Sequence, residues 1–108
     1  MKLYISGPMT GYDQLNYPAF EKAAQQLRSY GHEVVSPHEL NPITATEWIE
    51  CMKVDIRALL DCEGIAVLDG HEKSKGATLE NTIAAAMGME IKSLDDWLRG
   101  RFHGRRNK

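Results

Sequence analysis

A regular alternation of short apolar runs with segments of helical periodicity constrains the fold of this chain more than any other feature. The β-prone apolar runs centre on residues 3–5, 33–35, 65–68 and 91. Apolar residues recur at helical spacing over residues 17–30, 48–60 and 77–87, and again after Ser93. Strands that alternate with helices in this way form a parallel sheet through right-handed crossovers. The sequence therefore predicts an α/β protein, a doubly wound parallel sheet of about four to five strands with helices on both faces.

Residues that typically cap helices mark where the predicted helices begin and end. Asn16 is expected to cap the first helix, and Gly31 to end it in a left-handed conformation. Residues 44–47 have the Thr-x-x-Glu spacing of a capping box, which predicts the start of the second helix. Gly88 should end the third helix, and Ser93 should cap a terminal one. The buried stripe expected on the second helix comprises Trp48, Met52, Ile56, Leu59 and Leu60.

The size and composition of the chain fit one globular domain. The 108 residues are 43% hydrophobic and 26% charged, values that are ordinary for a folded protein. No stretch approaches the roughly 18 consecutive apolar residues of a membrane span. The apolar run near the N-terminus is too short for a signal peptide, because it breaks at Gly7. We therefore expect a cytoplasmic protein that does not bind membranes.

The charge of the chain is divided between an acidic body and a basic tail. Residues 1–98 carry 8 Lys and Arg against 15 Asp and Glu, a net charge of −7, whereas residues 99–108 carry a net charge of +5. We therefore divide the chain into a domain over residues 1–98 and a C-terminal tail over residues 99–108. An acidic body argues against nucleic-acid binding, which needs clustered Lys and Arg. The tail is either a solvated terminus or a contact for an anion or an acidic partner.

The two cysteines do not have the spacing of a metal site. Cys51 and Cys62 lie eleven positions apart, outside any CxxC motif. We therefore expect neither a disulfide nor a zinc site, and we expect both residues to behave as small buried hydrophobic side chains.

Three loops follow the carboxyl ends of the predicted strands, over residues 6–16, 36–43 and 69–77, where ligands of such sheets bind. The first contains two glycines that would let an anion approach the backbone, within Ser6, Gly7, Pro8, Met9, Thr10 and Gly11. The third contains Ser74, Lys75 and Gly76 directly before a helix, whose N-terminus favours an anion. Without a ligand, the first would be a plain turn and the third a capping loop.

Two acidic residues on helices are candidates for chemistry. Glu80 lies about one turn into an alanine-rich helix, and Asp55 lies in the middle of the preceding helix. The pattern alone favours a surface position for both. If they line a pocket instead, the helix N-terminus would keep Glu80 ionised as a nucleophile, and two carboxylates would suit cleavage at a glycosidic carbon. Asp69 competes with Asp55 for the second role, and His38 could hydrogen-bond a base or a sugar, although a lone loop histidine is typically solvated.

Three segments together resemble the nucleoside 2-deoxyribosyltransferase superfamily. They are residues 4–11, Asp55 followed by Ile56, and residues 74–80. The resemblance extends over about residues 2–92, and is strongest to small phage and bacterial deoxyribosyltransferase-like proteins of a family without an assigned function. The chain is also similar to the 2'-deoxynucleoside 5'-phosphate N-hydrolases. The resemblance implies a Rossmann-like (flavodoxin-like) fold and cleavage of a deoxyribose N-glycosidic bond.

The resemblance also implies a role for individual residues. Glu80 matches the nucleophilic glutamate, which attacks C1' and forms a covalent deoxyribosyl-enzyme. Asp55 matches an aspartate that assists the base and orients the sugar, which favours it over Asp69. Tyr4 matches a tyrosine that positions the glutamate or the sugar. Ser74 matches a serine that contacts the 5'-phosphate in the hydrolases, so that a nucleotide is favoured over a nucleoside. The backbone of Gly7, Met9, Thr10 and Gly11 would complete this phosphate-binding segment.

The expected activity is therefore cleavage or transfer of the N-glycosidic bond of a 2'-deoxynucleoside 5'-monophosphate, with no metal or organic cofactor. The expected partners are this small-molecule substrate and further copies of the chain, in a homodimer or a higher homo-oligomer. The chain departs from the resembled family directly after the nucleophile, where the family usually has glycine and this chain has Asn81, a larger residue expected to crowd the base or alter helix packing. This departure motivates an alternative, a non-catalytic module that binds or senses a nucleotide.

Overall fold

A single four-stranded sheet organises the computed structural model, which describes residues 1–45 and 47–99. The strands are β1 (Lys2–Ser6), β2 (Glu33–Val35), β3 (Gly64–Val67) and β4 (Glu90–Ser93). The helices are α1 (Tyr17–Ser29), α2 (Pro37–Leu40), α3 (Trp48–Leu59) and α4 (Lys75–Ala86), with single-turn 3₁₀ helices at Asp13–Asn16 and His71–Lys73. Residues 94–99 are also helical. The strands run parallel in the order β2-β1-β3-β4, which confirms the predicted doubly wound α/β fold.

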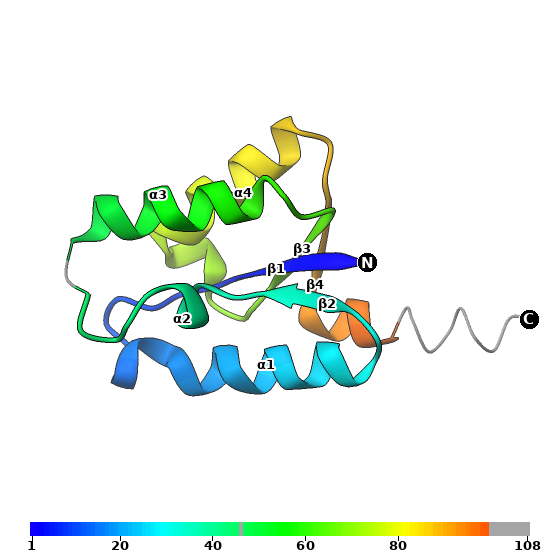
Figure 1. Ribbon diagram of the computed structural model, residues 1–108, viewed down its shortest axis with the longest axis horizontal. Helices are drawn as coiled ribbons and strands as arrows, with labels where there is room; N and C mark the ends of the chain where they lie inside the picture. The colour runs from blue at the N-terminus through cyan, green and yellow to red at the C-terminus, as the bar shows by residue number, and fades with distance from the viewer. Residues whose placement is uncertain (46, 100–108) are drawn as a thin grey trace, which may run out of the picture.

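Helices cover both faces of the sheet (Figure 1). α1 and the helix over residues 94–99 lie on one face, and α3 and α4 lie on the other. The alternation of side chains along β1 divides the core between these layers, since successive residues of a strand point to opposite faces. Leu3 and Ile5 pack with α1 residues such as Phe20, whereas Tyr4 packs on the opposite face with Leu59 and Ala84.

A close contact between β3 and the terminal helix requires glycine at position 64. A Cβ on Gly64 would lie 2.9 Å from the carbonyl oxygen of Glu90 and 2.9 Å from Cζ2 of Trp97. Nearby, the indole Nε1–H of Trp97 donates to the carbonyl of Ile65 at 2.7 Å. This contact anchors residues 94–99 on the central strands.

Some predicted helix ends are confirmed and others are wrong. Gly31 and Gly88 follow their helices with φ of 93° and 75°, and the Ser93 hydroxyl accepts a hydrogen bond from Asp96 N–H. Asn16, however, has a left-handed backbone and its amide donates to the Pro8 carbonyl, so its side chain does not cap α1. The capping box at residues 44–47 is also wrong, because α3 begins at Trp48, one residue after the expected glutamate, with no side-chain cap.

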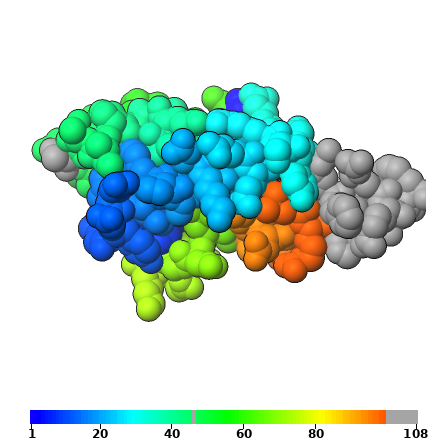
Figure 2. Space-filling view, turned by 90° about the horizontal axis from the view of Figure 1, so that it is seen from below, coloured from blue at the N-terminus to red at the C-terminus, as the bar shows by residue number. Residues whose placement is uncertain are grey.

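The three loops expected on the ligand side gather at the carboxyl edge of the sheet. The Tyr17 hydroxyl donates to the Asn41 carbonyl at 2.9 Å, which joins the start of α1, directly after the first loop, to the second loop. A Cβ on Gly70 would lie 2.7 Å from the Tyr12 hydroxyl, which places the third loop against the first. Figure 2 shows these two loops, blue and yellow-green, side by side. The second loop is not wholly irregular as expected, because it contains the short helix α2.

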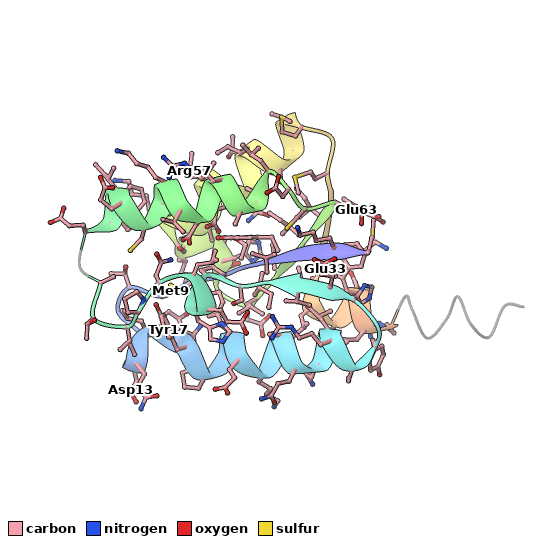
Figure 3. The ribbon with its side chains drawn as sticks, viewed as in Figure 1. Met9, Asp13, Tyr17, Glu33, Arg57 and Glu63 are labelled. Carbon is pink, nitrogen blue, oxygen red and sulfur yellow. The ribbon has the colours of Figure 1, made fainter. Side chains whose placement is uncertain are left out.

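The amino ends of the strands lie at the opposite edge of the sheet, away from these loops. Figure 3 shows Glu33 and Glu63 close to the N-terminus, whereas Met9 and Tyr17 lie at the other end, beside α2. Within the described residues, no helix is both long and apolar enough to span a bilayer. Of the predicted basic tail, only Arg99 is described, and residues 100–108 lie outside the described part of the chain.

The cysteines fit the expectation only in part. Both are free thiols, as predicted. Cys62 is buried and its Sγ lies 3.5 Å from the Ala58 carbonyl, but Cys51 is only half-buried. Cys51 lies one residue before Met52, the first buried position of α3, and so lies beside the buried stripe of that helix.

Candidate active site

The centre of the candidate site is Glu80, whose side chain reaches β1 from α4. The Tyr4 hydroxyl donates to Oε2 at 2.6 Å, and the Ser6 hydroxyl lies 2.8 Å from Oε1. Tyr4 and Ser6 are two residues apart on β1, so they share the face that α4 covers. All three residues are buried, and Glu80 is only 4% exposed. A carboxylate so enclosed is tolerated because each of its oxygens has a hydroxyl partner.

The sequence of α4 explains how an acid comes to be buried there. The buried positions of the helix are Ala77, Glu80 and Ala84, which lie on one face at helical spacing. Because the two alanines are small, the helix packs closely on β1 and β3 and presents Glu80 to the sheet. The pattern-based expectation of a surface position for Glu80 is therefore wrong.

Asp55 is the second buried acid of the site. It lies on α3, is 5% exposed, and accepts a hydrogen bond from Asn41 Nδ2 at 2.8 Å. The buried stripe of α3 is Met52, Asp55 and Leu59. The stripe predicted from the sequence is thus wrong in part, since Trp48 and Leu60 are 38% and 50% exposed. The helix is rotated so that an acid, and not Ile56, faces inward.

Burial raises the pKa values of both acids toward neutrality. Desolvation raises the pKa of Glu80 to about 7, against the opposing effect of the hydrogen bonds from Tyr4 and Ser6, and the charge of Asp55 raises it further. Desolvation likewise raises the pKa of Asp55 to about 6, which the Asn41 amide opposes. Burial, with the charge of Glu80, raises the pKa of Tyr4 well above 10.0. Desolvation is the largest influence on the pKa of Glu80, so the carboxyl group is less acidic than the position near a helix N-terminus led us to expect.

The residues expected to bind phosphate lie at the start of α4 and in the first loop. The Ser74 hydroxyl caps α4 by accepting a hydrogen bond from Ala77 N–H at 3.1 Å. The ammonium group of Lys75 lies 4.5 Å from the centre of the Trp48 ring. A Cβ on Gly76 would lie 3.2 Å from Met52 Sδ, so this turn packs against α3. In the first loop, Pro8 is buried, Gly7 and Met9 are half-buried, and Thr10 and Gly11 are exposed.

Two other predicted site residues lie outside the hydrogen-bonded cluster around Glu80. His38 Nδ1 lies 2.6 Å from the Ser36 hydroxyl, and its ring packs edge-on against Tyr17. It is therefore half-buried and held by neighbours, and not solvated as is typical of a loop histidine. Asp69 is exposed beyond the end of β3. In the described ranges, no three His, Cys, Asp or Glu side chains are grouped so as to hold a metal ion.

Two asparagines contact the buried acids and hydroxyls, and the sequence did not indicate these contacts, although it singled out Asn81 for its size. Asn41 supports Asp55, and Asn81 donates from Nδ2 to the Ser6 hydroxyl at 3.2 Å. The only available signals were that Asn41 lies in a predicted ligand-side loop and that Asn81 follows Glu80. Neither signal indicates which way an amide points.

A comparison with models of protein families found a model that matches most of the chain. A family model described as a domain of unknown function (DUF4406) matches residues 1–93. The chain belongs to the DUF4406 family. No curated protein matches this DUF4406 chain. Among solved structures, the 2-deoxyribosyltransferase of the psychrotolerant bacterium Bacillus psychrosaccharolyticus is similar to it, with a TM-score of 0.65 and 23% sequence identity over 84% of this chain and 69% of that one. The likeness confirms the deoxyribosyltransferase-like fold that the sequence predicted.

Proposed function

We propose that this DUF4406 protein cleaves the N-glycosidic bond of a 2'-deoxynucleoside 5'-monophosphate, with Glu80 as the nucleophile. The observation that carries the proposal is the buried carboxylate of Glu80, held by Tyr4 and Ser6 at the carboxyl edge of the sheet with Asp55 nearby. The structurally similar protein is named as a 2-deoxyribosyltransferase, which supports a glycosyl-transfer activity here. A carboxylate with a pKa of about 7 has both protonation states available at neutral pH.

In the proposed reaction, the ionised carboxylate of Glu80 attacks C1' of the deoxyribose. The bond from C1' to the base nitrogen breaks, and its electron pair leaves with the base. Asp55, whose pKa is raised to about 6, would supply a proton to the departing base. Water or a second base then attacks C1' and gives a proton to the Asp55 carboxylate, while the bond from C1' to Glu80 breaks. This step releases the free sugar phosphate or the new nucleotide and restores both acids. Tyr4 and Ser6 hold the carboxylate in position throughout.

The 5'-phosphate would bind between the first loop and the start of α4. Backbone N–H groups at the N-terminus of a helix attract anions, and Ser74 and Lys75 add a hydroxyl and a positive charge. Binding would require the ammonium group of Lys75 to turn from the Trp48 ring toward the phosphate, and such exposed cation–π contacts are weak, about 0.5–1 kcal/mol.

A Ser74→Asp variant separates the phosphate role of this residue from its role as a helix cap. Aspartate caps a helix about as well as serine, so the free energy of unfolding is expected to stay within about 0.5 kcal/mol of the wild-type value. The added negative charge should repel a phosphate, so kcat/KM on the nucleotide is expected to fall by about tenfold or more, with little change on the corresponding nucleoside. Equal losses on both substrates would contradict the phosphate role.

The proposed function is tested by measuring base release from a panel of 2'-deoxynucleoside 5'-monophosphates, each with and without a second free base. Release without an acceptor indicates a hydrolase, and exchange that requires the acceptor indicates a transferase. If no base is released and calorimetry still detects nucleotide binding, the protein is the binding or sensing module that the sequence left as the alternative.

We also propose that a second copy of the chain packs on the outer surface of α3 and α4. A groove of about 390 Å³ there is lined by Trp48, Ile49, Met52, Lys53, Ile56, Arg57 and Leu79. Ile49 is 61% exposed and lines this groove together with Trp48 and Leu79, which are each 38% exposed, so apolar side chains are exposed here as a group. Sedimentation equilibrium is expected to give at least a dimer for wild type and a monomer for Ile49→Glu. A monomeric wild type would contradict the proposal.

A further inference from the structure

Asn81 lies next to the proposed nucleophile without touching its carboxylate directly. Its Nδ2 lies 2.7 Å from the Ala77 carbonyl oxygen and 3.2 Å from the Ser6 hydroxyl. The Ser6 hydroxyl in turn lies 2.8 Å from Glu80 Oε1. The three side chains thus form a short chain of hydrogen bonds from α4 to β1 and back to α4.

The orientation of the Asn81 amide follows from its partners. The two ends of an amide are distinguished only by what they bond to, and a backbone carbonyl oxygen can only accept. The end of the amide that faces the Ala77 carbonyl must therefore be the NH₂ group. That group carries two protons, so it donates one to the Ala77 carbonyl and one to the Ser6 oxygen.

The orientation of Asn81 then determines the direction of the Ser6 proton. A serine hydroxyl has one proton and two lone pairs. Since Asn81 donates to one lone pair, the proton of the hydroxyl is left to point at Glu80 Oε1. We propose that Asn81 is a positioning residue, which holds the Ser6 hydroxyl as a permanent donor to Glu80.

This arrangement gives each oxygen of Glu80 a hydroxyl donor, Ser6 on Oε1 and Tyr4 on Oε2. Two donors favour the ionised carboxylate and oppose the effect of its burial. The other titratable groups that act on Glu80 are Tyr4 from β1 and Asp55 from α3, and Asn81 carries no charge of its own. The catalytic consequence rests on the proposed function, because only an ionised Glu80 can attack C1'.

The inference is tested by following the titration of Glu80 directly. The protein is labelled with ¹³C at the glutamate side-chain carboxyl, the Glu80 signal is assigned by its loss in Glu80→Gln, and its midpoint is measured by NMR. In Asn81→Ala the Ser6 hydroxyl is free to rotate, so the midpoint is expected to rise by about half a pH unit or more. Ser6→Ala is expected to raise it at least as much. The double variant should match Ser6→Ala, because Asn81 acts only through Ser6.

Thr82→Ala is the matched control. Thr82 lies one residue further along α4, and its hydroxyl donates to the Thr78 carbonyl four residues back, as the Asn81 amide does to Ala77. Its loss removes the same kind of bond without affecting Ser6, so the Glu80 midpoint should stay at the wild-type value. The inference would be overturned if the titration midpoint of Glu80 were unchanged in Asn81→Ala. It would also be overturned if the midpoint shift of the double variant equalled the sum of the two single shifts.

The titration tests the role of Asn81 and the activity assay tests the proposed function, so either claim can be wrong while the other holds. If the Glu80 midpoint moves as expected but no variant and no wild-type sample releases a base, the proposed function is wrong and the positioning role stands. If base release occurs, the acid limb in the pH profile of kcat/KM should lie at higher pH in Asn81→Ala than in wild type, by the same number of pH units as the NMR midpoint. An acid limb that stays in place while base release continues would show that Asn81 does not position the nucleophile.

Discussion

Glu80→Gln is expected to reduce base release from the preferred nucleotide by about a thousandfold or more. A glutamine amide cannot form the glycosyl ester, so the reaction loses its covalent route, whereas binding residues remain in place. The side chain has the same shape, and its carbonyl and amide ends can still bond to the Tyr4 and Ser6 hydroxyls. The fold should therefore be retained, and kcat/KM measured by release of the free base is the readout.

The control for this variant is a glutamate close in sequence to the site. Glu72 lies in the 3₁₀ helix before α4 and is exposed, so Glu72→Gln is expected to leave base release unchanged. Unfolding temperatures of both variants show whether any loss comes from misfolding. Turnover in Glu80→Gln within a few-fold of wild type would remove Glu80 from the mechanism, although the site could still bind a nucleotide.

The fold was predictable because its signals are local. The run at residues 65–68 is apolar at every position, as expected of a strand covered on both faces, and Gly31 ends α1 in the conformation that glycine favours. The start of α3 was not predictable in the same way. Residues 44–47 have the spacing of a capping box, but the chain enters the helix only at Trp48, one turn later than the box would require.

The sequence pattern named Glu80 and Asp55 as candidates but favoured surface positions for both, and only the family resemblance favoured a shared site. The geometry of that site is made by contacts between residues far apart in the chain. Glu80 is held by hydroxyls that precede it by 74 and 76 residues, and no local pattern links them. Asp55 faces inward because α3 is rotated relative to its apolar stripe, with Asn41 as its donor. The Asn81 amide is oriented by the nearby Ala77 carbonyl, but its bond to the Ser6 hydroxyl joins residues 75 positions apart, which no local pattern indicates.

The burial of Glu80 is expected to make the protein less stable as the pH rises. Its pKa is about 7 in the folded chain and 4.5 when exposed, so the folded state favours the protonated form. The stability that this preference contributes is fully present below about pH 4.5 and is lost as the pH rises through about 7. A difference of this size corresponds to about 3 kcal/mol of unfolding free energy. The raised pKa of Asp55 acts in the same direction, between about 4 and 6.

Urea unfolding between about pH 4 and pH 8 measures this slope. Glu80→Gln is expected to remove about half of it, above all the part between about pH 6 and pH 7, because glutamine does not titrate whereas Asp55 still does. Glu72→Gln should keep the wild-type slope. The claim that burial of Glu80 lowers stability at high pH would be contradicted if the wild-type free energy of unfolding did not change over this pH range. It would also be contradicted if that free energy fell equally in Glu80→Gln. An apolar residue at position 80 would need no hydroxyl partners and would not titrate, so a measured slope of this kind would show that the chain accepts a cost in stability at the position of the proposed nucleophile.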